Sequence, residues 1–197
     1  MYFTSLYLQQ VLGYSALMTG LAFLPFSIIA ALTSLIASPL VPRLGLKAMT
    51  VSGLLSMALG LLLYTQFPVN GNFWRDVLPG SLFIGVGVTL AGIPMTIAAL
   101  SDVSAQDSGL ASGLINTSQQ IGSAIVLALL VTISSIYTEA VSLSSGNSPG
   151  MRANALTEGF RFAFLIGAVL MILGAFVAML LIPGSGSRRS SKGQSNI

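Results

Sequence analysis

The sequence predicts an all-α fold, a polytopic transmembrane bundle of five full helices preceded by a partial first helix. Two observations lead to this prediction. Hydrophobic residues make up 54% of the 197 residues and charged residues only 7%, whereas soluble domains carry about 25% charged residues. Five long stretches also lack any charge, at 1–42, 48–74, 77–101, 108–138 and 162–187. Since roughly 20 apolar residues suffice for one spanning helix, these stretches set the architecture.

The expected elements follow the uncharged stretches in order. A partial helix covers 1–12, and full helices follow at 16–40, 48–66, 78–100, 109–136 and 159–182. Pro39, Pro42 and Gly45 close the helix at 16–40, a polar turn spans 66–72, and the longest loop is expected at 139–157. We therefore divide the chain into a transmembrane bundle, 1–182, and a disordered basic tail, 183–197, of glycine, serine and basic residues.

Composition excludes several classes of function. The chain has no cysteine and no histidine, which excludes disulfides, thiol catalysis and zinc fingers and removes the usual proton shuttle at neutral pH. The sequence shows no nucleophile–base pair and no metal cluster, so we expect neither an enzyme nor a bound metal or cofactor. The net charge of +3 is small and unclustered, so no nucleic-acid partner is expected. The expected surroundings are a lipid bilayer.

The distribution of basic residues predicts the orientation, because lysine and arginine favour the cytoplasmic side. With a cytoplasmic C-terminus, five of the eight basic residues lie inside and three outside. This bias predicts a multi-pass protein of the cell membrane with a cytoplasmic tail, and the inverted topology is the alternative. The inside residues are Arg43, Lys47, Arg188, Arg189 and Lys192, and the outside residues are Arg75, Arg152 and Arg161.

The segment 39–47 is a tight loop in which Gly45 lies between Arg43 and Lys47. Taken alone, it is equally typical of a basic cytoplasmic anchor. The segment resembles the loop motif of major facilitator superfamily transporters, with Arg43, Gly45 and Lys47 matching its later positions. Pro42 and Leu46 depart from that motif, as in the weaker copy found in the second half of such proteins.

Two further segments carry the resemblance to the fourteen-helix drug:proton antiporters of this superfamily. Residues 7–25 are similar to their ninth-to-tenth helix connection, and residues 108–122 to their thirteenth helix. The resemblance implies the C-terminal half of a proton-coupled transporter that exports drugs or other amphipathic small molecules. It also implies a missing N-terminal half, and the expected first helix is too short to span. The alternative is a non-transporting membrane subunit or fragment that pairs with another chain.

Polar residues of the helix at 109–136 are the candidates for a substrate cavity. Their spacing by four, three and four residues places four of them on one helix face, with Gln120 beside it. Polar side chains are costly in lipid, so this face should contact protein or a water-filled cavity. Interhelical hydrogen bonding is the alternative, and the resemblance favours the cavity because the matching helix lines the pathway in the family. The four residues are Ser112, Asn116, Gln119 and Ser123.

Apolar residues and glycines complete the candidate set. Phe23, Phe26 and Met95, with Met18 and Phe83, are candidates for an adaptable apolar wall, although packing and lipid contact are commoner roles. Close packing, a bend or a hinge is expected at the small residues and prolines of two helices. These are Pro25, Gly85, Gly87, Gly92 and Pro94.

Ionisable residues are missing from the middle of every expected helix. Proton coupling normally needs such a group inside the membrane. We therefore expect the coupling carboxylate in the missing half of the transporter.

Overall fold

A computed structural model describes residues 1–101, 103–104, 106–145 and 149–182, so the predicted tail at 183–197 lies outside the described residues. The described residues form helices joined by turns, without a strand. Four helical segments are long and apolar enough to cross a membrane. The all-α polytopic bundle predicted from the sequence is confirmed. The four segments are Ala16–Tyr64, Phe73–Leu100, Ser108–Val141 and Ala153–Leu181.

The chain begins with a short helix made of α1 (Tyr2–Leu6) and the π-helical η1 (Tyr7–Val11), which matches the partial helix predicted for 1–12. Gly13 follows with a φ of 71°, a backbone conformation that glycine adopts without steric cost. Ser15 then caps α2 (Ala16–Ala22) by accepting a hydrogen bond from the backbone nitrogen of Met18 at 3.3 Å. These two residues turn the chain from the short helix into the bundle.

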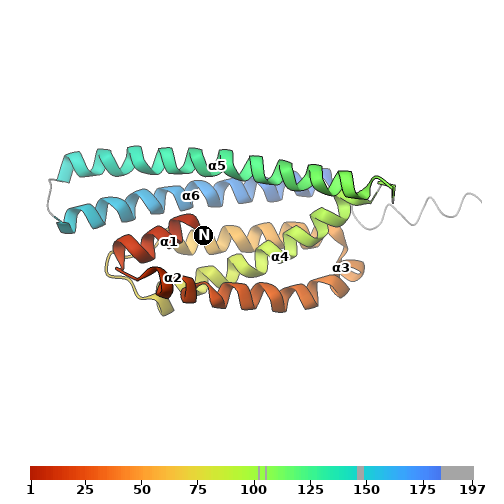
Figure 1. The fold of residues 1–197 in the computed structure, drawn as a ribbon, viewed down its shortest axis with the longest axis horizontal. Coiled ribbons are helices and arrows are strands. Elements are labelled where there is room, and N and C mark those ends of the chain that lie inside the picture. Colours follow the sequence, from red (N-terminus) through yellow and green to blue (C-terminus); the bar gives the residue numbers. More distant parts are fainter. Residues whose placement is uncertain (102, 105, 146–148, 183–197) are drawn as a thin grey trace, which may run out of the picture.

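Helix α3 (Leu24–Tyr64) is two helices joined at Gly45, whose φ of 81° and ψ of 157° are not helical. The chain reverses there, so residues 24–44 and 46–64 run in opposite directions (Figure 1). The first and longest apolar segment therefore contributes two of the five predicted full helices. Pro39 and Pro42 lie in the last turns before this reversal.

Helix α4 (Leu78–Leu100), preceded by the π-helical η2 (Phe73–Val77), packs against both halves of α3. The Thr89 hydroxyl donates to the Ala30 carbonyl in the first half at 3.2 Å, and the Ser56 hydroxyl of the second half donates to the Phe83 carbonyl at 2.7 Å. A Cβ added at Gly53 would lie 2.4 Å from the Ala91 nitrogen. Glycine therefore allows the two backbones to approach closely, as in many membrane helix pairs.

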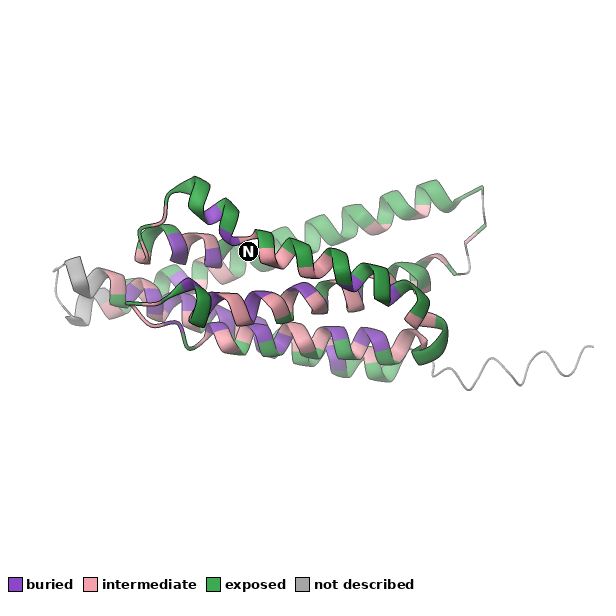
Figure 2. Ribbon diagram, turned by 90° about the horizontal axis from the view of Figure 1, so that it is seen from below, coloured by how far each residue is buried: buried purple, intermediate pink, exposed green. Residues whose placement is uncertain are grey.

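Helices α5 (Ser108–Ser145) and α6 (Pro149–Leu181) run antiparallel along one side of the bundle (Figure 1). Helix α6 packs against the second half of α3, with Gly167 next to Leu61. Helix α5 contacts α6 closely near Gly159, where an added Cβ would lie 2.9 Å from the Ser134 carbonyl oxygen. Figure 2 shows that buried residues occupy the inward faces of the packed helices and that much of the outer surface is exposed.

The expected loop at 139–157 is wrong, because α5 extends to Ser145 and α6 begins at Pro149. The prediction ended the helices where charged residues such as Glu139 and Glu158 appear. A charge marks the end of the apolar stretch but not of the helix, because a helix satisfies its own backbone hydrogen bonds in water as in lipid. A proline at the start of α6 also fits, since the first helical position needs no amide hydrogen.

Candidate functional site

The polar residues predicted for a substrate cavity lie on the first two thirds of α5 and are all exposed. Among the described residues, the side chains of Asn116, Gln119 and Gln120 make no hydrogen bond, while the Ser123 hydroxyl donates to the Gln120 carbonyl at 2.9 Å. Ser112 is exposed one turn before Asn116. The alternative was that these residues form hydrogen bonds between helices. Within the described chain, the side chains of Asn116, Gln119 and Gln120 have no such partner.

The apolar candidates do not gather around one cavity. Phe26 contacts Gly85 of α4, since a Cβ added at Gly85 would lie 3.0 Å from the Phe26 carbonyl oxygen. Met95 is ten residues further along α4, about 15 Å along the helix axis, and is 48% exposed. Phe23 is half-buried at the start of α3. The expected apolar wall is thus divided between the two ends of α4.

The packing candidates have different surroundings. Cβ atoms added at Gly85 and Gly87 would lie 2.5 Å from the Ile29 side chain and 2.6 Å from the Gly53 carbonyl oxygen, respectively. Gly92 has nothing within 4 Å among the described residues, so the packing expected there has no partner. Pro94 is fully buried inside α4. Pro25 lies in the first turn of α3, where a proline breaks no helical hydrogen bond, so it does not interrupt that helix.

The loop resembling the family motif forms the reversal within α3. Arg43 is exposed and Lys47 is half-buried on either side of Gly45. Neither cation forms an ion pair with a residue that the structure describes. The positive φ of Gly45 explains the need for glycine at this position.

An aromatic cluster that the sequence did not predict packs at the opposite end of the bundle from Gly45. It consists of Phe3, Tyr7, Tyr64, Phe67 and Phe164. The rings of Tyr7 and Phe67 stack with centroids 4.2 Å apart, and those of Tyr64 and Phe164 meet edge to face at 5.1 Å. Each such pair contributes about 0.5–1.5 kcal/mol beyond the area that it buries. The cluster joins η1, α3 and α6.

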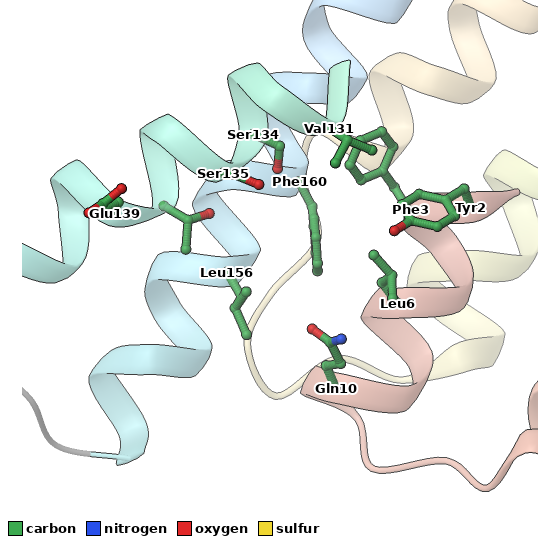
Figure 3. A pocket seen from close by; sticks show the side chains of 11 residues that line it. Tyr2, Phe3, Leu6, Gln10, Val131, Ser134, Ser135, Glu139, Leu156 and Phe160 are labelled. Carbon is green, nitrogen blue, oxygen red and sulfur yellow. The ribbon is translucent and has the colours of Figure 1, made fainter. Parts of the chain in front are cut away.

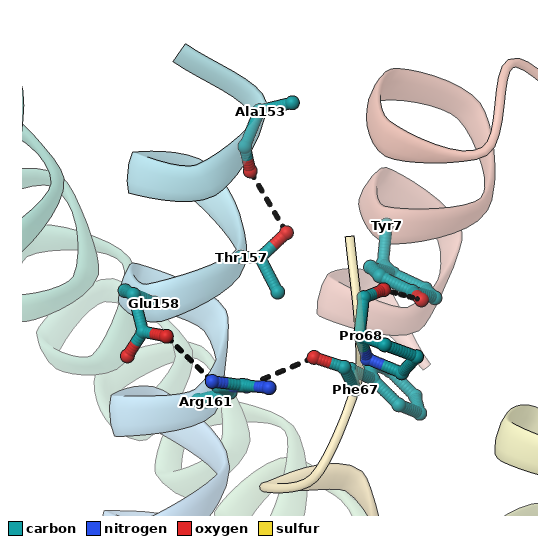
Figure 4. Close-up of polar contacts among 7 residues, drawn as sticks. All are labelled: Tyr7, Phe67, Pro68, Ala153, Thr157, Glu158 and Arg161. Atoms are coloured by element: carbon teal, nitrogen blue, oxygen red, sulfur yellow. Dashed lines mark hydrogen bonds and ion pairs between the residues drawn. The ribbon is translucent and has the colours of Figure 1, made fainter. Parts of the chain in front are cut away.

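Polar contacts fix the loop 65–72 to the same cluster (Figure 4). The Tyr7 hydroxyl donates to the Pro68 carbonyl at 2.6 Å, and the Nε of Arg161 donates to the Phe67 carbonyl at 2.9 Å. Arg161 also forms an ion pair with Glu158 at 2.5 Å. These backbone partners are 61 and 94 residues apart in the sequence, so no local pattern could have indicated them.

The Tyr7 phenol, which lies outside the four apolar spans, is kept neutral by its surroundings. Burial raises its pKa from 10.0 to about 12, the nearby Asp76 carboxylate raises it further, and Arg161 opposes the change. The phenol therefore stays a hydrogen-bond donor to Pro68 at any physiological pH.

A cavity of about 410 Å³ lies between the short first helix, α5 and α6, at the same end as the aromatic cluster (Figure 3). Its wall combines aromatic and aliphatic side chains with hydroxyl groups and one carboxylate. We refer to it as the η1–α5–α6 cavity. Its lining residues include Phe3, Leu6, Gln10, Ser135, Glu139 and Phe160.

Metal binding has no support within the described part of the chain. The residue types that ligate metals do not gather there in groups of three or more.

These features define a polytopic helical membrane protein with a long, exposed polar helix face. The chain belongs to the major facilitator superfamily, whose family model matches residues 1–196. This membership places the chain among transporters and not among enzymes.

The chain is also similar to several curated proteins. It is 31% identical over 198 residues to the puromycin resistance protein pur8 of Streptomyces alboniger, which covers 99% of this chain and 39% of that protein. It is 35% identical over 137 residues to the multidrug resistance protein Stp of Mycobacterium tuberculosis, covering 70% and 25% of the two chains. It is 30% identical over 183 residues to the cephamycin export protein CmcT of Amycolatopsis lactamdurans, covering 92% and 35%. The chain thus spans about two fifths or less of the length of these relatives.

Proposed function

We propose that this chain forms the C-terminal helical bundle of a secondary active transporter that exports drugs or other amphipathic small molecules. The family and the names of the relatives, which refer to puromycin resistance, multidrug resistance and cephamycin export, support this class of activity. The observation that carries the proposal is the polar face of α5, which is exposed and lacks hydrogen-bond partners at Asn116, Gln119 and Gln120 within the described chain.

The polar face of α5 is the proposed wall of the substrate pathway. Unpaired amides on a membrane-spanning helix are costly in lipid, so they favour a position against a water-filled cavity. A substrate crossing that cavity would exchange its hydration for hydrogen bonds to Ser112, Asn116, Gln119, Gln120 and Ser123. Phe26 of α3 or Met95 of α4 would add an apolar contact.

The remaining candidate residues are proposed to belong to the helical bundle that moves during transport. In related folds, two helical bundles rock around a site near the middle of the membrane. Close packing at Gly85 and Gly87 keeps α3 and α4 together as one body. The loop with Arg43, Gly45 and Lys47 is proposed to face the cytoplasm, together with the C-terminus, in the cell membrane.

The proposed partner of this bundle is inferred from the positions of its ionisable side chains. In the described spans, ionisable side chains such as Arg43, Asp76 and Glu139 lie near helix ends. A proton-coupling group is therefore proposed for the rest of the transporter, an N-terminal half that this chain needs for activity. The match to at most 39% of the relatives' length supports such a division.

A chimeric transporter tests this proposal. This chain replaces the aligned segment of the Streptomyces alboniger puromycin resistance protein, and puromycin resistance and efflux from vesicles are measured. We expect efflux by the chimera and none by vesicles that hold this chain alone. Replacing Asn116 and Gln119 with alanine should lower efflux about tenfold, because two hydrogen bonds of about 0.5–1.5 kcal/mol each are lost.

The matched control is Ser118→Ala, which changes a polar residue on the far side of the same helix, given a rotation of about 100° per residue. Proton-driven efflux by this chain alone would contradict the half-transporter proposal. A chimera that reaches the membrane, retains its fold and transports nothing would favour the alternative, a non-transporting subunit that pairs with another chain.

A further inference from the structure

Another cavity, of about 550 Å³, lies between the loop 65–72 and the start of the η2–α4 segment. Its polar wall carries three amide side chains and two charges of opposite sign, and we call it the η2 cavity. It lies between the end of the apolar span Ala16–Tyr64 and the start of the span Phe73–Leu100. The η2 cavity is therefore at the depth where lipid headgroups meet water. Its amide and charged lining residues are Gln66, Asn70, Asn72, Arg75 and Asp76.

The two charges of the η2 cavity have no ionic partner within the described part of the chain. Arg75 and Asp76 are neighbours in the sequence and line the same cavity, yet they form no ion pair with each other or with another described residue. Asp76 uses its Oδ2 to accept a hydrogen bond from the Asn72 backbone nitrogen at 2.6 Å, which leaves its Oδ1 for a ligand. A ligand with a negative and a positive group side by side would satisfy both charges.

An apolar surface leads from the η2 cavity along α3 and α4. Leu63 of α3 and Pro79 of α4 line the cavity itself. Leu59 and Phe83 lie four residues further from the loop on the same helix faces, and they are 44% and 42% exposed. The Ser56 hydroxyl donates to the Phe83 carbonyl at 2.7 Å, so the two helices stay adjacent at this depth. The polar cavity thus continues into an apolar surface within the two spans.

Trp74 marks the same boundary. It is the single tryptophan of the chain, it precedes Arg75, and it is 71% exposed. Tryptophan is enriched where membrane meets water, because its ring is apolar while its N–H needs a hydrogen-bond partner. The ring is therefore placed to contact lipid headgroups beside the η2 cavity.

We propose that the η2 cavity binds a phospholipid whose headgroup carries a phosphate and a primary ammonium group. The phosphate pairs with Arg75, and the ammonium group pairs with the Oδ1 of Asp76 and donates its remaining hydrogens to the amide oxygens of the cavity. The acyl chains lie along Leu59 and Phe83. Because the charges of Arg75 and Asp76 cancel, a zwitterionic headgroup fits better than an anionic one. The whole site lies within this chain, so lipid binding does not depend on the proposed transport function.

The fluorescence of Trp74 provides the test, since bromine atoms on a neighbouring lipid quench it. The purified chain is placed in bilayers of digalactosyl diacylglycerol, a neutral lipid without phosphate. Brominated phosphatidylethanolamine or brominated phosphatidylglycerol is added in increasing amounts, and the quenching gives the affinity of each relative to the host lipid. We expect phosphatidylethanolamine to bind about fivefold more tightly than the host lipid. Phosphatidylglycerol, which lacks the ammonium group, should bind less tightly than phosphatidylethanolamine.

Substitutions separate the two charges. Arg75→Gln removes the partner of the phosphate and should weaken the binding of both phospholipids. Asp76→Asn keeps an oxygen that can accept from the Asn72 nitrogen. It should weaken the binding of phosphatidylethanolamine about threefold and strengthen that of phosphatidylglycerol, because a negative charge facing the phosphate is removed. A loss of local structure would instead change the binding of both lipids in the same direction.

Two variants control this experiment. Arg75→Lys keeps the positive charge and should retain most of the phosphatidylethanolamine binding. Arg43→Gln removes an exposed cation next to the chain reversal at Gly45, away from the cavity, and should leave both affinities unchanged. Circular dichroism of each variant confirms that the helices remain folded. Equal affinities for the two phospholipids, equal changes of both by Asp76→Asn, or equal losses from Arg75→Gln and Arg43→Gln would overturn the proposal.

Discussion

The α3–α4 interface and the first half of α5 contain similar residues in opposite situations. Both are rich in glycine and small polar residues. At the interface, glycines such as Gly53 and Gly87 bring two backbones into contact, whereas a Cβ added at Gly113 or Gly122 of α5 would have no described neighbour within 4 Å. Composition alone therefore does not separate a packed helix from an open one. The difference shows that the first half of α5 has an open face among the described residues.

Polar side chains differ in the same way between the aromatic cluster and the first half of α5. At that end of the bundle, Tyr7 and Arg161 bind backbone carbonyls of the loop 65–72. On the open half of α5, Asn116 and Gln119 bind none of the described residues. Buried polar groups cost free energy unless they are paired, so the paired groups belong to the folded framework and the unpaired groups to a surface. Three substitutions measure this contrast.

The largest effect is expected for Gly53→Ala. Its Cβ would meet three backbone atoms of α4 at 2.4–2.8 Å, so the two helices must separate, at a cost of about 3 kcal/mol in the free energy of unfolding. Unfolding of the purified chain by sodium dodecyl sulfate, followed by circular dichroism, measures this change. Gly122→Ala on α5 is the matched control and should change stability by less than about 0.5 kcal/mol. Similar losses of stability at Gly53 and Gly122 would show that the α3–α4 interface and the first half of α5 do not differ in packing.

A smaller effect is expected for Arg161→Gln. The substitution removes the ion pair with Glu158 and the hydrogen bond to the Phe67 carbonyl. Because the side chain is 33% exposed, solvent screens the pair, and we expect a loss of about 1.5 kcal/mol. The same unfolding measurement applies. Arg75 is exposed and forms no ion pair or side-chain hydrogen bond with a described residue, so Arg75→Gln should be neutral. An equal loss there would show that Arg161 acts only through net charge.

The smallest effect is expected for Tyr7→Phe, at about 1 kcal/mol, because one hydrogen bond is lost. Its pH dependence is more specific. The pKa of Tyr7 rises from 10.0 to about 12 on folding, so the stabilising contribution of the phenol is complete below pH 10 and is lost as pH rises toward 12. Thermal unfolding at several pH values should show that the difference between wild type and variant shrinks above pH 10.

The control for Tyr7→Phe is Tyr2→Phe, because Tyr2 is 47% exposed. This substitution should not change stability. A difference for Tyr7→Phe that stays constant up to pH 12 would show that its phenol is not held neutral by the fold.

The sequence was sufficient for the parts of the fold that depend on local composition. Uncharged stretches identified every long helix, and Gly45 marked the reversal within α3, because helix-breaking residues act on their own backbone. The extent of α5 and α6 was missed because Glu139 and Glu158 mark the ends of uncharged stretches and not the helix ends. Both helices continue past those charges.

The candidate site was accessible to sequence reasoning only in part. The polar face of α5 follows from helical spacing alone, and the structure leaves those residues exposed, but what they contact stays a prediction. The aromatic cluster and the η1–α5–α6 cavity depend on contacts such as Tyr7 with Pro68 and Phe3 with Phe160, which are far apart in the sequence. Such pairings are set by how the helices pack together, and no periodicity in the sequence records them.

The length of α5 has a practical consequence. Its 38 residues extend about 57 Å, and even a tilt of about 40° leaves it longer than the hydrocarbon core of about 30 Å. With the apolar part of α5 in the bilayer, we expect the end that carries Glu139 to extend into water, next to Glu158 and Arg161 of α6. An antibody fragment raised against it would report on intact cells which side of the membrane it faces. The same fragment would supply the rigid external mass that electron cryomicroscopy needs to align images of a helical membrane protein.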